Sequence, residues 1–146
     1  MSDLNRFIEA QEEGYPRALK EIKNGMKETH WMWYIFPQII GLGRSSTAEY
    51  YAIKDLDEAR EYLNDEVLGA RLKEISNELL KLETNTPTLV FGAVDSLKLN
   101  SSMTLFDYVS DSSIFSEVID KYYDGKKDEL TITICDKMSG KSLKVK

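Results

Sequence analysis

Cysteine and histidine are nearly absent from this sequence, which contains only Cys135 and His30. A single cysteine cannot form a disulfide within the chain. One cysteine with one histidine also falls short of a zinc finger, a zinc ribbon or a histidine-rich catalytic zinc site. We therefore expect no metal and no cofactor. Cys135 lies in a β-branched apolar run, which favours an inert buried thiol over a nucleophile.

Long apolar runs are also missing. The longest uncharged run, residues 29–43, is too short to cross a bilayer and contains Pro37 and Gln38. The first residues lack the basic start and the apolar stretch of a signal peptide. Without an export signal or an internal disulfide, a cytoplasmic location is expected.

Positive charge is in the minority, with 19 Lys and Arg against 25 Asp and Glu and a net charge of −6. This balance argues against general binding to nucleic acid or to anionic membranes. The 146 residues, 42% of them hydrophobic, suit one folded domain. We expect that domain to span residues 1–136, followed by a short Lys-rich extension over residues 137–146.

Helical spacing dominates the apolar pattern. Five apolar residues between Leu68 and Leu82 recur at alternating steps of four and three, which predicts a helix over about residues 65–82. Capping and stop residues mark the other predicted helices. These are a helix capped by Ser2 or Asp3 and ended by Gly14, a second from Pro16 to Gly25, starts capped by Ser46 and Asp55, a turn over 88–91 closed by Gly92, a helix capped by Asp95, and one from Ser112 or Ser113 to Gly125.

Two segments are ambiguous between helix and strand. Residues 30–37 are apolar on every side and must be buried, and their aromatic content slightly favours a strand. Residues 130–135 have the β-branching and alternation of a strand, but no second strand is found to pair with them. The expected fold class is therefore all-α, a single multi-helix domain with room for one short extended segment near the C-terminus.

The only histidine lies among aromatic residues in segment 29–36. One interpretation is a pocket wall, in which Trp31, Trp33 and Phe36 stack a ring and His30 exchanges a proton. The alternative is a core plug, in which His30 is hydrogen-bonded to the backbone. That alternative is the commoner outcome for a histidine among apolar residues.

A polar string over residues 95–104 is the second segment that could carry chemistry. On a helix, Asp95, Lys98 and Ser102 share one face, and an apolar stripe occupies another. A cation in the first helical turn is disfavoured by ~0.3–1 kcal/mol if exposed, so Lys98 breaks a local rule. Lys98 with free amides could hold a phosphate or a carboxylate. In the alternative, Asp95 is the cap, Lys98 pairs with it and the serines are solvated.

Residues 41–46 have a faint likeness to a phosphate-binding loop. They lack the preceding strand and the full glycine spacing of a dinucleotide fingerprint, and the sequence contains no Walker pattern. Arg44, beside a capped helix start, could still contact an anion. No nucleophile-elbow motif supports a catalytic triad built on His30.

These segments carry a family resemblance. The strings over residues 29–38, 41–45 and 101–106 resemble the bacterial domain-of-unknown-function family 1810, and the resemblance extends from residue 3 to about residue 134. It implies a single all-α domain in which residues 130–135 form a short helix or an irregular end. The family brings no established activity. Its genome label, calpastatin, is a misnomer, because true calpain inhibitors of that name are disordered and this chain has a full core pattern.

A shorter likeness concerns the class of ligand. Residues 58–82, followed by Phe91, Gly92 and Asp95, look a little like the second half of the NADAR domain. That domain is associated with ADP-ribose and related N-glycosides. The likeness therefore implies a nucleotide-like, NAD-derived ligand.

Two functions remain open. The first is a small-molecule pocket or enzyme with a small anionic, nucleotide-like ligand. As an enzyme it would hydrolyse N-glycosidic bonds, with His30 and Asp95 in proton transfer and Asp95 stabilising positive charge on the sugar or activating water. The second is a helical protein-interaction module without chemistry, which predicts an exposed apolar patch for an unidentified partner. The first function assigns ligand binding to Trp31, Trp33, Phe36, Gln38, Arg44, Ser45, Tyr51, Lys98, Ser101, Ser102 and Thr104.

Overall fold

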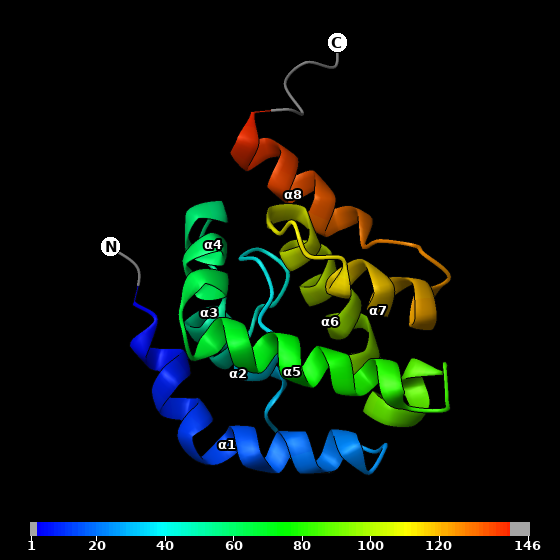
Figure 1. Ribbon diagram of the computed structural model, residues 1–146. Coiled ribbons are helices and arrows are strands. Elements are labelled where there is room, and N and C mark those ends of the chain that lie inside the picture. The colour runs from blue at the N-terminus through cyan, green and yellow to red at the C-terminus, as the bar shows by residue number, and fades with distance from the viewer. Residues whose placement is uncertain (1–2, 141–146) are drawn as a thin grey trace.

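The chain folds into helices joined by short loops. The structure is a computed structural model that describes residues 3–140, and within that range it contains eight helices and no strand. The expected all-α fold is confirmed. The helices, labelled in Figure 1, are α1 (Asn5–Lys23), α2 (Met32–Ile35), α3 (Ser46–Tyr51), α4 (Leu56–Asn64), α5 (Leu68–Lys81), α6 (Pro87–Val109), α7 (Ile114–Tyr123) and α8 (Glu129–Ser139).

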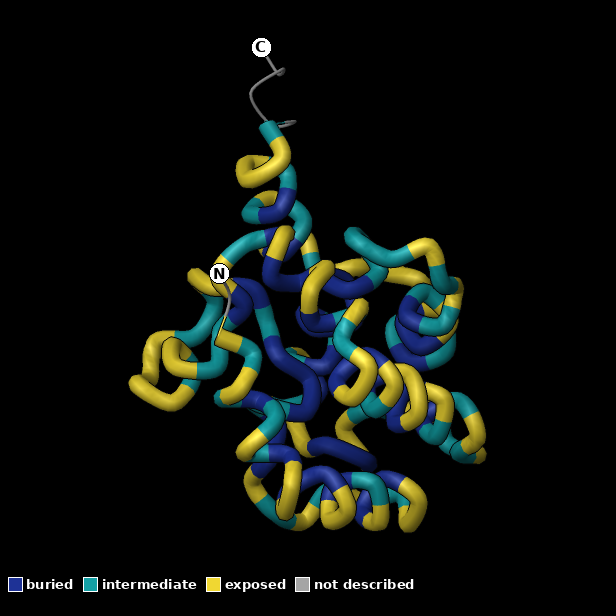
Figure 2. Tube along the Cα trace, turned by 60° about the vertical axis from the view of Figure 1, so that its left-hand side comes forward, coloured by how far each residue is buried: buried dark blue, intermediate teal, exposed yellow. Residues whose placement is uncertain are grey.

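Helix α6 forms the centre of the fold. Helices α4, α7 and α8 pack against it, while α1 lies beside α5 and contacts α2 (Figure 1). Residues 101–106 of α6 are all buried. Figure 2 shows buried positions gathered inside the molecule and exposed positions on its outer turns. Part of the polar string that was expected to carry chemistry is therefore in the core.

A chain of aromatic contacts joins four helices through this core. The rings of Phe7 in α1 and Tyr62 in α4 meet edge to face, with their centroids 5.1 Å apart. Tyr62 then contacts Phe106 of α6 at 5.3 Å, and Phe106 contacts Phe115 of α7 at 6.0 Å. Such aromatic pairs each contribute ~0.5–1.5 kcal/mol beyond the burial of their surface.

Several local signals placed helix ends correctly. Asp55 caps α4 by accepting a 2.8 Å hydrogen bond from the amide of Glu58. Helix α5 spans nearly the range that its apolar stripe predicts, and α7 begins after Ser113 as expected. At α3 the cap lies one residue earlier than predicted. Ser45 accepts from the Ala48 amide at 3.1 Å, and Ser46 is the first helical residue.

The first helix is longer than predicted. Helix α1 continues through Gly14 and Pro16, where the sequence suggested a stop and a new start. A Cβ added to Gly14 would lie 2.5 Å from the Tyr34 ring, so this glycine permits close packing rather than ending a helix. The predicted cap Asp3 makes no such bond, since Leu4 holds the cap position without a side-chain hydrogen bond. The alternative cap, Ser2, lies outside the described residues.

Neither ambiguous segment forms a strand. Residues 32–35 form the short helix α2, so the slight preference for a strand was wrong, although the predicted burial is confirmed for Trp31, Met32, Ile35 and Phe36. Residues 130–135 lie in α8, as the family resemblance implied and against the β-branched pattern. Tertiary packing overrides propensity here. Asp128 caps α8, and Thr131 and Cys135 are buried one turn apart.

Helix α6 is broken near its start. Gly92 has φ 81° and ψ 172°, and glycine reaches this positive φ without steric cost. The predicted turn closed by Gly92 is therefore confirmed. Asp95 was expected to cap the following helix, but it lies inside α6, and its carboxylate contacts two lysines.

The last helix runs into the expected C-terminal extension. Helix α8 continues to Ser139, past the expected domain end at residue 136. The last part of the predicted extension, residues 141–146, lies outside the described residues. Over residues 3–140, no helix is both long and apolar enough to cross a membrane.

Candidate functional site

The fold brings the two segments singled out in the sequence against each other. The ammonium of Lys27 lies 2.9 Å from Asp95 Oδ2, which joins the loop before α2 to α6. On the same side of α6, Lys98 Nζ lies 5.4 Å from the centre of the Trp33 ring. The aromatic segment and the Asp95–Lys98 helix face therefore meet through Trp33 and Lys98.

A buried carboxylate holds the loop that carries Lys27. Glu21 of α1 accepts hydrogen bonds from the amides of Glu28 and Thr29 at 2.7 and 3.0 Å, from the Thr29 hydroxyl at 2.6 Å and from the Trp31 indole N–H at 2.8 Å. Burial by itself raises the pKa of Glu21, but these four bonds outweigh it and lower the pKa to about 2. The carboxylate therefore stays ionised and fixes the loop.

Trp31 and Phe36 do not form a ligand wall. Each is 1% exposed, and their rings lie 6.3 and 6.0 Å from Phe91 in the core. The indole N–H of Trp31 is already bonded to Glu21. The pocket-wall interpretation therefore does not fit these two residues, because both rings are enclosed in the core.

His30 follows neither of the two interpretations of its segment. Its side chain is exposed, and it makes no hydrogen bond or ion pair with any described residue. From this loop it is Lys27, and not His30, that pairs with Asp95, and the Lys27 ammonium also donates to the Thr29 carbonyl at 2.6 Å. The imidazole is therefore available to solvent beside the loop that meets α6.

A cavity opens between the loop after α2, the first half of α6 and the start of α8. Its volume of about 380 Å³ lies within the usual range for small-molecule sites. Three of the predicted binding residues line it, namely Gln38, Lys98 and Ser101. Its wall is completed by Leu42, Gly43, Val94, Leu97, Asp128 and Leu130.

Trp33 and Tyr51 lie beside this cavity rather than in it. Both are half-buried, and together with Gln38 they line a space of about 10 Å³, roughly enough for one water molecule. Gln38 and Gly43 line both spaces. The loop over residues 38–43 is therefore the partition between them.

The other predicted binding residues do not line the cavity. Arg44 is exposed, and Ser45 caps α3. Thr104 is fully buried, where its hydroxyl donates to Asn100 Oδ1 at 3.2 Å and accepts from the Asp128 amide at 3.0 Å. Ser102 is also fully buried, and its hydroxyl has no hydrogen-bond partner among the described residues.

Two residues of this region escaped the sequence analysis. Lys27 gives no local signal, because its partner Asp95 is in a helix far along the chain. Asp128 lines the cavity and caps α8 by accepting from the Thr131 amide at 3.0 Å. An aspartate directly before a helix is a recognisable cap signal, but Asp128 can be read in this way only once residues 130–135 are assigned to a helix.

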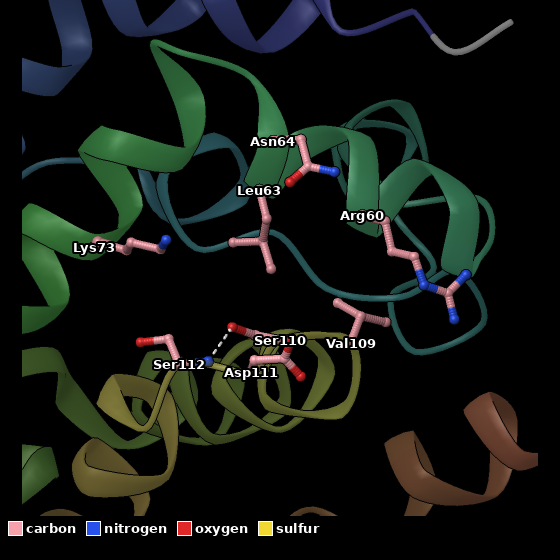
Figure 3. Close-up of a pocket in the computed structure, with 8 residues that line it drawn as sticks. All are labelled: Arg60, Leu63, Asn64, Lys73, Val109, Ser110, Asp111 and Ser112. Carbon is pink, nitrogen blue, oxygen red and sulfur yellow. Dashed lines mark hydrogen bonds between the residues drawn. The ribbon is translucent and has the colours of Figure 1, made fainter.

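A second cavity lies between α4, α5 and the loop from α6 to α7 (Figure 3). Its volume is about 270 Å³. Lys73 extends toward it from α5, Asp111 lines it from the loop after α6, and the Arg60 guanidinium is paired with Asp57 at 3.2 Å. Opposite charges thus share this cavity. None of its lining residues was predicted to bind a ligand.

The described residues offer little for metal or thiol chemistry. Between residues 3 and 140, no group of three or more His, Cys, Asp or Glu is placed to hold a metal ion. Burial raises the pKa of the Cys135 thiol to about 11, and the neighbouring charge of Asp136 adds to the shift. The thiol is therefore protonated near neutral pH, in agreement with an inert core cysteine.

Comparison with known proteins identifies the family. The family described as "Protein of unknown function (DUF1810)" matches residues 1–135. The chain belongs to this family. A crystal structure of a conserved hypothetical protein from Mycobacterium tuberculosis is similar to this chain, with 41% sequence identity, a TM-score of 0.89 and coverage of 90% of this chain and 95% of that one. No protein of curated function matches. These matches establish the family and the fold, and neither description names an activity.

Proposed function

We propose that the cavity beside Lys98 binds a small anionic, nucleotide-like molecule and that the protein hydrolyses an N-glycosidic bond in it. The observation that supports this proposal is the joint presence of Gln38, Lys98 and Ser101 on one cavity of about 380 Å³. Residues from two distant segments therefore line a single space, and they carry a cation, an amide and a hydroxyl that also donates to the Leu97 carbonyl at 3.2 Å. These groups suit an anion and the polar edge of a ring.

Lys98 is the anion-binding group in this proposal. Its side chain is 27% exposed, and its ammonium lies 3.7 Å from Asp95 Oδ1, beyond the length of a good hydrogen bond. A lysine ammonium has three donors. Lys98 therefore retains donors for a phosphate or carboxylate in the cavity.

Apolar side chains at the rim supply a surface for the ring. Val94, Leu97 and Leu130 are 66%, 70% and 56% exposed, and all three line the cavity. Covering them with a flat ring would remove apolar surface from water, which stabilises the complex. In this proposal these three side chains, and not Trp31 and Phe36, form the apolar surface that contacts the ring of the ligand.

The proposed reaction adds water across the bond between a sugar carbon and a nitrogen. The hydroxyl goes to the carbon, and the proton goes to the departing nitrogen. The sequence assigned proton transfer to His30 and Asp95, and neither residue is among those that line the cavity. Both oxygens of Asp95 contact lysines, which favours charge stabilisation over action as a base, because a base must leave an oxygen free to accept the proton.

The test is a thermal-shift screen against nucleotides, NAD, ADP-ribose and sugar phosphates. A ligand at 100 times its dissociation constant should stabilise the protein by about 2.7 kcal/mol, which is a measurable rise in Tm. The rise should disappear in Lys98→Ala. It should persist in Lys73→Ala, a matched control whose lysine lines the other cavity.

Three outcomes would contradict this proposal or part of it. A shift that survives Lys98→Ala but is lost in Lys73→Ala would move the ligand to the second cavity. No shift with any compound would reject the small-molecule function. A bound compound that stays intact by mass spectrometry, in wild type as in Asp95→Asn, would reject hydrolysis and leave a binding protein.

The same rim also favours a second candidate function, a protein-interaction module. Exposed Val94, Leu97 and Leu130 form an apolar patch of the kind that partner proteins cover. In that case Leu97→Asp should abolish a specific partner in pull-downs, and Lys98→Ala should leave it bound. Loss of a small-molecule Tm shift in both variants would instead favour the ligand.

A further inference from the structure

Asp95 is contacted by two lysines. Lys27 Nζ lies 2.9 Å from one carboxylate oxygen, and Lys98 Nζ lies 3.7 Å from the other. Two ammonium groups thus share one carboxylate. Counting these three side chains alone, two positive charges and one negative charge leave one positive charge on the group. Asp128 adds a separate carboxylate to the cavity wall.

Lys27 is the more firmly held of the two lysines. Its side chain is only 7% exposed, and its ammonium also bonds the Thr29 carbonyl at 2.6 Å and lies 5.0 Å from the centre of the Trp31 ring. A cation this deeply buried needs a compensating charge, since desolvation of an unpaired ion is costly. The carboxylate of Asp95 is therefore committed to Lys27. Lys98 is more exposed and more distant.

We propose that Lys27 keeps Lys98 available for an anion by neutralising Asp95. This inference rests on the proposed function, because it assumes that the cavity takes a phosphate or carboxylate group at Lys98. Lys27 does not line the cavity, so it is a positioning residue that acts through Asp95. Without Lys27, Asp95 would pair with Lys98 and cancel the charge that attracts the ligand.

The carboxylate of Asp128, on the cavity wall, is satisfied elsewhere. It accepts from the Thr131 amide at 3.0 Å and from the Thr131 hydroxyl at 2.5 Å at the N-terminus of α8. The dipole of a helix favours a negative charge at that end. Asp128 is therefore held by α8 and makes no ion pair with Lys98, although its negative charge remains on the cavity wall.

A charge cycle tests this role, with inorganic phosphate as the probe. Titrations are made by calorimetry at low ionic strength, with chloride at equal ionic strength as the control. Lys27→Met keeps the length of the side chain but makes the three-residue charge zero, and phosphate affinity should fall by at least about tenfold. The double variant Lys27→Met/Asp95→Asn restores the single positive charge, and its affinity should return to within about threefold of wild type.

A second measurement needs no ligand. In a crystal structure of Lys27→Met, the distance from Lys98 Nζ to Asp95 Oδ1 should shorten from 3.7 Å to a hydrogen bond of about 2.8–3.2 Å. An unchanged distance would overturn the charge-balancing role. So would a double variant that binds phosphate no better than Lys27→Met, since a purely structural Lys27 would not be rescued by removing a charge.

The two proposals fail in different ways. If wild-type protein does not bind phosphate and Lys98→Ala changes nothing, the anion site itself is rejected. If wild type binds phosphate, Lys98→Ala does not, and Lys27→Met binds as wild type does, only the role of Lys27 is rejected. Asp95→Asn covers the case in which Lys27→Met fails to fold. It should bind phosphate at least as tightly as wild type, and weaker binding would overturn the inference.

Discussion

Two clusters of oppositely charged side chains join distant segments of this chain. They differ in how many of their hydrogen-bond donors and charges have partners within the protein. Arg6 of α1 meets Glu58 of α4 through two contacts of 3.1 and 3.3 Å, with the two side chains 9% and 1% exposed. That cluster has one cation for one anion. The cluster beside the cavity places Lys27 and Lys98 on a single Asp95.

The Arg6 cluster has little capacity left for a ligand. Its guanidinium also donates to the carbonyls of Tyr50 and Ala52 at 2.8 Å each, and Glu58 accepts from the Lys54 amide at 2.9 Å. A saturated, buried pair of this kind fixes α1 and α4 together. In the cluster beside the cavity, two lysines share one carboxylate, so Lys98 keeps donors for a ligand. An ion pair by itself therefore does not tell a structural cation from a ligand-binding one, and we use the number of cations per carboxylate to separate them.

Breaking the saturated pair should have the largest effect. Arg6→Met leaves Glu58 charged and buried without its partner, and we expect it to lower the free energy of unfolding by about 3–5 kcal/mol. Urea denaturation measures the change. Arg60→Met is the matched control, because Arg60 and Asp57 form an exposed pair whose loss should cost less than about 1 kcal/mol. Equal effects in the two variants would contradict the distinction.

Acid should break the loop that carries Lys27. The pKa of Glu21 is about 2 in the folded protein against an ordinary 4.5, so its contribution to stability is full above pH 4.5 and is lost as pH falls toward 2. The shift corresponds to roughly 3 kcal/mol. Urea unfolding of wild type and Glu21→Gln between pH 7 and 2.5 should show a stability difference that shrinks with acidity. A difference independent of pH would refute this role for the charge.

Removing the surplus cation should have the smallest effect on stability. Lys98 is partly exposed and lies 3.7 Å from Asp95, so Lys98→Met should change the free energy of unfolding by less than about 1 kcal/mol. Thermal and urea unfolding provide the measurement. A loss as large as that of Arg6→Met would place Lys98 among the structural residues.

Helices with an uninterrupted apolar stripe were predictable from sequence, and those set by distant contacts were not. The spacing from Leu68 to Leu82 gave α5 nearly its observed bounds. The β-branched run in α8 misled local analysis, because Thr131 and Cys135 are buried by packing that no local pattern describes. Gly14 looked like a stop for a similar reason, since the Tyr34 ring that requires it lies beyond the end of α1.

The candidate site was partly predictable for the same physical reason. Lys98 was found because a polar stripe on a helix is visible in the sequence, and it lines the cavity, whereas Ser102 of the same stripe is buried. Trp31 looks identical in sequence whether it stacks a ligand or fills the core, and only its bond to Glu21 decides between them. Lys27 is an isolated lysine in sequence, and its role depends on a partner supplied by the fold.

The break at Gly92 has a mechanical consequence. Lys27 contacts α6 on both sides of Gly92. Its amide donates to the Val90 carbonyl at 2.7 Å, and its ammonium lies 2.9 Å from Asp95 Oδ2. Lys27 thus connects the two parts of α6 that meet at the Gly92 bend. A change in the bend at Gly92 would alter at least one of these two contacts. We therefore expect the part of α6 that lines the cavity and the loop before α2 to move together.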